Sequence, residues 1–269
     1  MRGDAMAINQ DSDLIFIFGR QRSGTTVFRE LLAQNGALNC DEILHGDLSR
    51  PFRFYQFVAE AAARDPALIH PQHHAALFRR YIEALRAEHG GKLAMDVKYF
   101  ALNLIPGGLG GGPFLIDYAA AQRAHVVLIL RRNKLRMIVS ERLAQATGRW
   151  SADRPERLLA KKPKVELAPE RIVAEIEALQ RMDRVVLEML GKTPWAEVLY
   201  YDEMFAANGD FSKQVQGVAR KVLGRGGDFR RPRNLKMNPE ALSDLIAAPE
   251  EIAAALRDTA HGWMLEGGG

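Results

Sequence analysis

The stretch that decides the fold is LIFIFGRQRSGTTVFRELLAQ, residues 14–34. It opens with Leu14–Phe18, a short run of apolar and aromatic residues typical of a buried strand, which breaks into the glycine turn Gly19–Gly24. From Thr25 onward, apolar side chains recur at helical spacing up to Asn35. The turn therefore leads onto a helix N-terminus, where free backbone N–H groups and the helix dipole favour an anion.

The turn has the Gly-x4-Gly spacing of a Walker A loop, but it lacks the lysine of that motif. Thr25 and Thr26 follow the second glycine, where a nucleotide hydrolase carries Lys-Ser/Thr. Arg22, inside the turn, is the replacement cation, and the two threonine hydroxyls can donate to phosphate oxygens without a metal. We therefore expect a phosphate or phosphosulfate site that is poorly suited to Mg-nucleotide hydrolysis.

The segment Arg22-Ser23-Gly24-Thr25-Thr26, placed after a strand, resembles the 5′-phosphosulfate loop of sulfotransferases. These enzymes use 3′-phosphoadenosine 5′-phosphosulfate (PAPS). The resemblance implies that these five residues bind the phosphosulfate, with Arg22 spanning the bridging oxygen and the sulfuryl oxygens. It also implies PAPS as co-substrate and no metal. A second phosphate site later in the chain would strengthen the resemblance.

The composition is that of a globular chain. With 269 residues, 47% of them hydrophobic, and no repeat or boundary, we expect one domain over residues 1–269. No apolar run approaches the roughly 20 residues of a membrane span, and residues 1–13 are too polar for a secretory signal. The single cysteine, Cys40, excludes an internal disulfide. These features favour a cytoplasmic protein, and a net charge of +4 favours an anionic ligand without requiring nucleic acid.

Candidate general bases follow the first helix. Residues 38–47 read as a short turn that carries Glu42 and His45, either of which could take a proton from an acceptor hydroxyl. Glu42 is the preferred base because it resembles the glutamate after the first helix in bacterial carbohydrate sulfotransferases of the trehalose 2-sulfotransferase and nodulation-factor type. His45 is the alternative.

Leu93–Lys98 reads as a second buried strand that ends in a lysine. Active sites of open α/β sheets lie at the carboxyl ends of the strands, so Lys98 should reach the same crevice as Arg22. The sequence here resembles the "G-x-K" strand end of the same sulfotransferases, which implies a catalytic role for Lys98.

A second phosphate site is expected where His125–Leu130, a continuous apolar strand, meets the helix 134–147 that Asn133 can cap. Arg132 and Ser140 match the arginine and serine that hold the 3′-phosphate in sulfotransferases. Arg131 could replace Arg132 if the register differs by one. PAPS needs two separated anion sites on one sheet edge, whereas ATP needs one, and a guanidinium with a neighbouring hydroxyl suits the 3′-phosphate.

The segment 131–150 as a whole resembles the nodulation-factor and trehalose sulfotransferases, including its terminal Thr-Gly-x-Trp. Trp150 can either stack on a sugar or adenine or anchor the loop. The arginine-rich segment 224–236 resembles the C-terminal segment that closes over the 3′-phosphate end of PAPS. His70, His73 and His74 have no carboxylate at clear metal-ligand spacing, so we assign them no metal.

The remaining elements are coarser expectations. We expect helices over 51–63, 71–89 and 170–190, a mobile glycine-rich loop at 107–112, a strand at 198–201, a helix capped by Asp210 that runs to Leu223, and final helices over 238–265.

These expectations combine into an α/β, P-loop-like three-layer fold with a mainly parallel central sheet flanked by helices. The resemblance implies a sulfotransferase that moves the sulfuryl group of PAPS to a hydroxyl of a carbohydrate or glycolipid acceptor. The alternative is a P-loop kinase or another nucleotide-binding phosphotransferase, which would consume ATP with Mg²⁺. A nucleic-acid-binding protein fits less well because the net charge is modest. The sequence leaves a homo-oligomer open.

Overall fold

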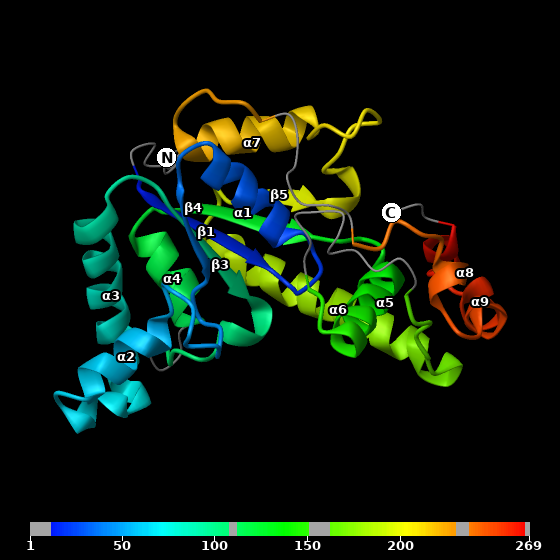
Figure 1. The fold of residues 1–269 in the computed structure, drawn as a ribbon, viewed down its shortest axis with the longest axis horizontal. Helices are drawn as coiled ribbons and strands as arrows, with labels where there is room; N and C mark the ends of the chain where they lie inside the picture. The colour runs from blue at the N-terminus through cyan, green and yellow to red at the C-terminus, as the bar shows by residue number, and fades with distance from the viewer. Residues whose placement is uncertain (1–11, 108–111, 151–161, 230–236, 267–269) are drawn as a thin grey trace, which may run out of the picture.

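The centre of the computed structural model is a five-stranded, all-parallel sheet with the strand order β2-β3-β1-β4-β5 (Figure 1). The structure describes residues 12–107, 112–150, 162–229 and 237–266. The strands are β1 (Leu14–Gly19), β2 (Leu38–Glu42), β3 (Leu93–Lys98), β4 (His125–Leu130) and β5 (Glu197–Tyr200). The helices are α1 (Thr25–Gln34), α2 (Phe54–Ala62), α3 (His74–His89), α4 (Phe114–Ala121), α5 (Lys134–Thr147), α6 (Pro169–Met189), α7 (Lys213–Leu223), α8 (Leu242–Leu245) and α9 (Pro249–Arg257).

The three central strands explain why the sheet is parallel and internal. Every residue of β1, β3 and β4 is buried. A strand that is buried on both faces has a continuous apolar sequence. The helices that cover the two faces of such a sheet are also the crossover connections that parallel strands require. The predicted α/β class with a mainly parallel sheet flanked by helices is therefore confirmed.

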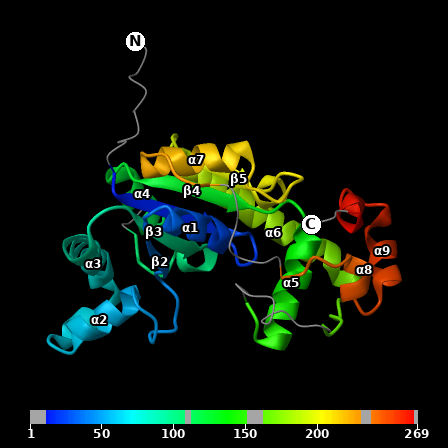
Figure 2. The same ribbon diagram turned by 45° about the horizontal axis from the view of Figure 1, so that its top comes forward.

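Alternate residues of the central strands face two different helical layers. Phe16 packs in a core with side chains of α2, α3, α4 and the C-terminal half of α6. Ile17, its neighbour along β1, packs instead with side chains of α1 and α7. Successive side chains of a strand point to opposite faces of the sheet, so each central strand contributes to both cores. This gives the three layers visible in Figures 1 and 2.

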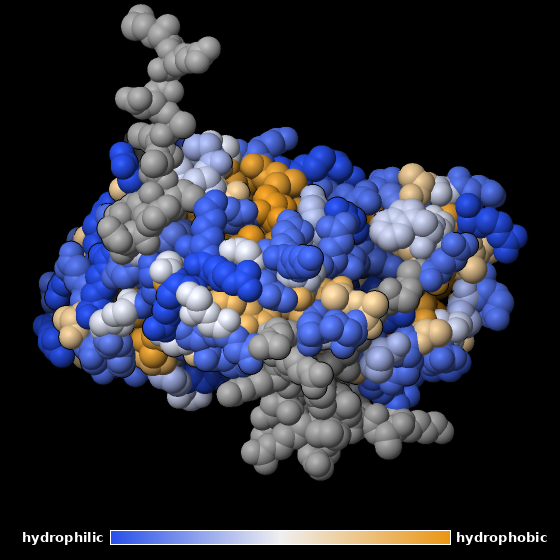
Figure 3. Space-filling model, turned by 90° about the horizontal axis from the view of Figure 1, so that it is seen from above, coloured by the Kyte–Doolittle hydropathy of each residue, from blue (hydrophilic) through white to orange (hydrophobic). Residues whose placement is uncertain are grey.

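A third cluster lies beyond the sheet. Side chains of α5 and the N-terminal half of α6 pack against α8 and α9. Both ribbon views place this cluster at one end of the molecule and the α2–α3 pair at the other (Figures 1 and 2). Seen from the side that carries α7, the surface is mainly hydrophilic (Figure 3). No helix in the described ranges has both the length and the hydrophobicity to cross a membrane.

The strand register brings the predicted site residues to one edge of the sheet. Gly19 pairs with Lys98 of β3 on one side and with Ile129 of β4 on the other. The turn after β1 and the residues after β4 therefore leave the sheet beside each other, and Lys98 lies directly opposite the start of the turn. This is the edge at which open α/β sheets bind ligands.

The prediction that residues 38–47 form a turn is wrong for their first half, because residues 38–42 form the edge strand β2. Only Cys40 of this strand is buried, and the pairing with β3 is interrupted between Asn39 and Glu42. Asp41 adopts a positive φ of 55°. A short edge strand with a bulge lacks the apolar run that identifies the central strands, so its sequence resembles a loop.

Two further expectations need correction. Asp210 does not cap the helix that ends at Leu223. Ser212 is the cap, since its hydroxyl accepts from Val215 N at 3.5 Å. The helix expected over 51–63 begins only at Phe54, and the one expected over 71–89 begins with a single 3-10 turn before α3. Most of the expected glycine-rich loop, at 108–111, and the second half of the arginine-rich segment, at 230–236, lie outside the described residues.

The aromatic core beneath the sheet gives a test of this packing. Phe78 is fully buried and its ring contacts Phe54, Tyr81, Phe114 and Tyr118. Phe78→Ala should lower the free energy of unfolding by about 3–5 kcal/mol, because it removes buried apolar area and leaves a cavity. Urea titration measures the change. The matched control is Phe100→Ala, whose side chain is 54% exposed, and it should change stability by less than about 0.5 kcal/mol.

Candidate active site

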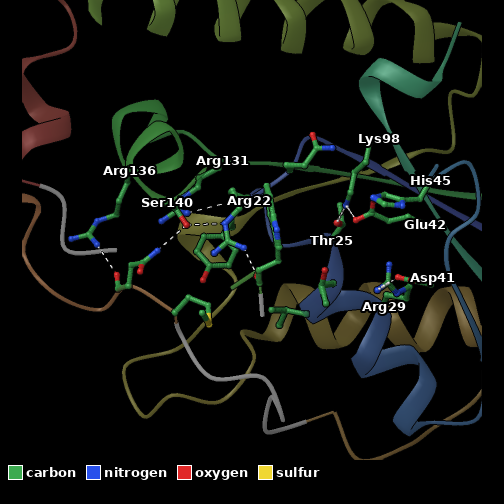
Figure 4. Close-up of a pocket in the computed structure, with 18 of the residues that line it drawn as sticks. Arg22, Thr25, Arg29, Asp41, Glu42, His45, Lys98, Arg131, Arg136 and Ser140 are labelled. Carbon is green, nitrogen blue, oxygen red and sulfur yellow. Dashed lines mark hydrogen bonds and ion pairs between the residues drawn. The ribbon is translucent and has the colours of Figure 1, made fainter. Parts of the chain in front are cut away.

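A cavity of about 480 Å³ opens at the carboxyl edge of the sheet. Figure 4 shows that its side chains come from the turn after β1, the ends of β2 and β3, the residues after β4, and α5. Within the described ranges, the cationic residues lining it are Arg22, Arg29, Arg50, Arg53, Lys98, Arg131 and Arg136, whereas the acidic ones are Asp41 and Glu42. The cavity therefore carries an excess of positive charge.

The turn between β1 and α1 forms one wall. Arg22 adopts a φ of 65° and Gly24 a φ of 98°, which directs the turn onto the first residue of α1. No side chain caps α1, and its first turn contains no acidic residue. The N–H groups at this end are thus available to an anion, together with the positive end of the helix dipole.

Ser23, predicted to bind the phosphosulfate, points away from the cavity. Its hydroxyl donates to the main-chain oxygen of Arg20 at 2.8 Å, and its N–H donates to the same oxygen at 3.2 Å. Ser23 therefore closes the turn internally. The other predicted loop residues, Arg22, Gly24, Thr25 and Thr26, all line the cavity.

Arg22 and Arg131 bring two guanidinium groups together at one end of the cavity. Arg22 Nε donates to Ser140 Oγ at 2.8 Å, and an Arg22 Nη donates to the main-chain oxygen of Trp150. Arg131 donates to the main-chain oxygen of Arg22 at 3.3 Å, and its guanidinium lies 4.6 Å from the centre of the Tyr201 ring. These acceptors are neutral. Among the described residues, neither guanidinium forms an ion pair with a carboxylate.

Both arginines are perturbed by this arrangement. Burial lowers the pKa of Arg22, and the nearby charge of Arg131 lowers it further. Burial also lowers the pKa of Arg131, whose Nε is buried and has no hydrogen-bond partner within the described part of the chain. Buried cations that lack counterions disfavour the free protein, and an anion placed between them would remove that cost.

Arg132, predicted to hold the 3′-phosphate, lies outside the cavity. Its guanidinium forms an ion pair with Glu203 and lies 3.8 Å from the centre of the Tyr200 ring. The adjacent Arg131, the alternative that the sequence leaves open, lines the cavity together with Ser140. The reason is the period of two at a strand end, which directs neighbouring side chains to opposite sides.

Lys98 reaches the opposite end of the turn, as its strand position predicts. Its Nζ contacts Thr25 Oγ1 at 2.5 Å and Asp96 Oδ2 at 2.8 Å, and only 4% of the side chain is exposed. Asp96 is fully buried and also pairs with Arg29 at 2.9 Å. Lys98 therefore places a positive charge at the first residue of α1, although it comes from a different strand than the turn.

Both candidate bases line the cavity. Glu42 Oε1 lies 3.4 Å from Lys98 Nζ, and about a quarter of its side chain is exposed. His45 is exposed, and its Nδ1 accepts from the Asp47 N–H at 3.0 Å. Glu42 thus lies beside the cation at the end of β3, whereas His45 lies in the loop that follows β2 (Figure 4).

Around Glu42 the positive charges are compensated, in contrast to the Arg22 end. Asp41 pairs with Arg29 and Arg53 at 2.7 Å each and with Arg50 at 3.5 Å. Although burial raises the pKa of Asp41, Arg29 and Arg53 outweigh it and hold that pKa below its usual value. The cavity therefore has one end with uncompensated positive charge and another end lined by ion pairs.

Several site residues were not found from the sequence. Tyr201 follows β5 and lies against both the glycine turn and Arg131. Asn238 donates to Ser140 Oγ at 3.0 Å from the C-terminal segment. Neither residue belongs to a local motif. Asp96 offered a signal, because an acidic residue inside an apolar strand requires buried partners. Trp150 is about half exposed at the cavity, so it does not anchor the loop in the core.

The glycine turn provides a test. A Cβ at Gly24 would lie 2.3 Å from Tyr201 Cδ2, and the φ of 98° disfavours any side chain. Gly24→Ala should therefore displace the turn and weaken binding of inorganic pyrophosphate about tenfold or more in calorimetry, because hydrogen bonds to the anion are lost. Gly209→Ala is the matched control, since Gly209 has a φ of 80° with open space around it. An equal loss in both variants would contradict an anion-binding turn.

No protein-family model matches this chain, and no curated protein matches it in sequence.

Proposed function

We propose that this protein transfers the sulfuryl group of PAPS to a hydroxyl of a carbohydrate or glycolipid. The observation that carries the proposal is the meeting of Arg22 and Arg131 at one cavity, each supplied by a different strand-to-helix junction. One junction, with its bare helix N-terminus, suits the phosphosulfate. The other, with Arg131 and Ser140, suits the 3′-phosphate.

The size and polarity of the cavity support a nucleotide ligand. Its volume of about 480 Å³ lies within the range of roughly 300–1,000 Å³ that small-molecule sites occupy. The buried Nε of Arg131 has no hydrogen-bond acceptor among the described residues, so it can donate to a ligand oxygen. A doubly phosphorylated nucleotide would place one phosphate at each strand-to-helix junction, whereas a nucleotide with phosphate at one end only would leave one junction without an anion.

The proposed reaction uses groups that surround the end of α1. The acceptor oxygen forms a bond to sulfur while the bond from sulfur to the bridging oxygen breaks. The bonding pair leaves with adenosine 3′,5′-bisphosphate (PAP), and the acceptor proton passes to the Glu42 carboxylate. Arg22 and Lys98 supply positive charge beside the oxygens that gain charge, which is the electrostatic contribution that usually dominates such transfers.

The kinase alternative is less well supported by this geometry. A phosphotransferase of the P-loop class needs a carboxylate near the loop to hold Mg²⁺. Lys98 contacts Thr25, and the carboxylates of Asp96 and Glu42 both contact Lys98. The Asp96 Oδ2 is bound by Arg29 as well, so the carboxylates near the loop are already paired with cations. The acceptor end of the cavity, lined by ion pairs whose oxygens and nitrogens can bind hydroxyls, supports a sugar-like acceptor.

Ligand preference tests the nucleotide assignment. Wild-type protein should bind PAP more tightly than AMP or ADP in calorimetry, and Arg131→Met should reduce the affinity for PAP about tenfold or more while affecting AMP less. Arg132→Met is the matched control. Its guanidinium pairs with exposed Glu203, and a surface pair of this kind contributes about 1 kcal/mol or less. Equal affinity of the wild type for PAP and AMP would refute the proposed site.

The base assignment is tested by turnover. Glu42→Gln should lower kcat for sulfuryl transfer from PAPS about 100-fold or more, because no group then accepts the acceptor proton. PAP affinity should stay within about threefold, since Glu42 belongs to the acceptor end of the cavity. His45→Gln is the matched control and should retain most of the turnover. The reverse pattern, with activity lost only in His45→Gln, would identify His45 as the base.

A further inference from the structure

The hydroxyl of Ser140 receives two hydrogen bonds. Arg22 Nε donates to Ser140 Oγ at 2.8 Å, and Asn238 Nδ2 donates to the same oxygen at 3.0 Å. A serine oxygen has two lone pairs and one O–H. Since a guanidinium and an amide nitrogen can only donate, both lone pairs are occupied. The remaining capacity of Ser140 is its own O–H, which has no acceptor among the described residues.

We propose that Asn238 is a specificity-determining residue, which commits Ser140 to donate its proton and so selects a ligand with an anionic oxygen at this position. This inference rests on the proposed function, because it assigns the 3′-phosphate of the nucleotide as that acceptor. Arg131 and Ser140 then present donors only to one tetrahedral oxyanion, while the Arg22 Nε holds the Ser140 oxygen in place. A ribose 3′-hydroxyl could accept from Ser140 but would bring no charge to Arg131.

The position of Asn238 is fixed by contacts with α5. Arg136, one turn before Ser140, donates to the main-chain oxygens of Asn238 and Glu240 at 3.0 Å each. Lys162 pairs with the Glu240 carboxylate at 2.7 Å and also donates to the main-chain oxygen of Met237. The segment 237–240 is thus held by Arg136 of α5 and by Lys162, through contacts that do not involve the Asn238 side-chain amide.

This separation makes the amide open to substitution. Asn238 is partly exposed, and the bonds that hold its segment use main-chain oxygens. Replacing its side chain removes the donor to Ser140, while the contacts of Arg136 and Lys162 with segment 237–240 remain. The isosteric change Asn238→Asp is the most informative, because a carboxylate accepts the Ser140 proton instead of donating to its oxygen. It also adds a negative charge next to the anion.

The test is calorimetry with PAP and AMP on the full chain. Asn238→Ala should weaken PAP binding about three- to tenfold, since Ser140 becomes free to rotate but can still donate. Asn238→Asp should weaken it about thirtyfold or more, because the loss of a hydrogen bond to a charged group combines with repulsion. AMP affinity should change less than about threefold in both variants. If the Asn238 side chain only packs, the opposite order is expected, and Asn238→Asp should weaken PAP binding less than Asn238→Ala.

A double-mutant cycle tests whether the effect passes through Ser140. In a Ser140→Ala background, adding Asn238→Ala should produce no further loss of PAP affinity, because the two residues act as one unit. Additive losses, or an Asn238→Asp variant that keeps the preference for PAP, would overturn the inference while leaving the proposed function standing. A wild-type protein that does not prefer PAP over AMP would overturn both.

Discussion

The repulsion between the buried Arg131 guanidinium and the partly buried Arg22 guanidinium is the constraint on which the rest of this site depends. Arg22 and Arg131 are held together by neutral partners, Ser140, Tyr201 and main-chain oxygens, and within the described ranges no ion pair offsets their charge. Desolvated cations without counterions disfavour the folded state. The parallel sheet overcomes this because β1 and β4 are adjacent and wholly buried, which fixes both junctions regardless of the charges they carry.

The two ends of the cavity use charge in different ways. Near Glu42, cations and carboxylates form a connected network in which Asp96 joins Lys98 to Arg29, and Arg29 joins Asp96 to Asp41. Such a network is nearly neutral, so it orients polar groups and attracts a charged ligand less strongly than the Arg22 end does. At the other end the charge is left open, and attraction of an anion is strong. The molecule therefore separates charge-driven binding from hydrogen-bonded positioning within one cavity.

The sequence predicted the parts of the site that belong to strongly apolar strands. β1, β3 and β4 are continuous hydrophobic runs, so their ends, and with them Arg22 and Lys98, could be placed on one edge of the sheet. Spacing alone does not show which of Arg131 and Arg132 faces the cavity, because it does not reveal where the side-chain alternation of β4 ends. β2 was read as a turn since an edge strand needs no apolar run. Partners such as Asn238 depend on tertiary contacts and leave no local pattern.

The β1–α1 junction and the residues after β4 also contact one another. Binding of an anion would therefore affect how well the whole site is ordered. The Tyr201 ring lies against Gly24 and beneath the Arg131 guanidinium, and Arg131 donates to the main chain of Arg22. A shift in any one of these residues therefore moves the others. An anion between the guanidiniums removes their repulsion and stabilises all three contacts together, so its binding free energy adds to the stability of the fold. Under the proposed function, the residues that repel each other in the free protein would attract the ligand, and the site would exchange some stability for affinity.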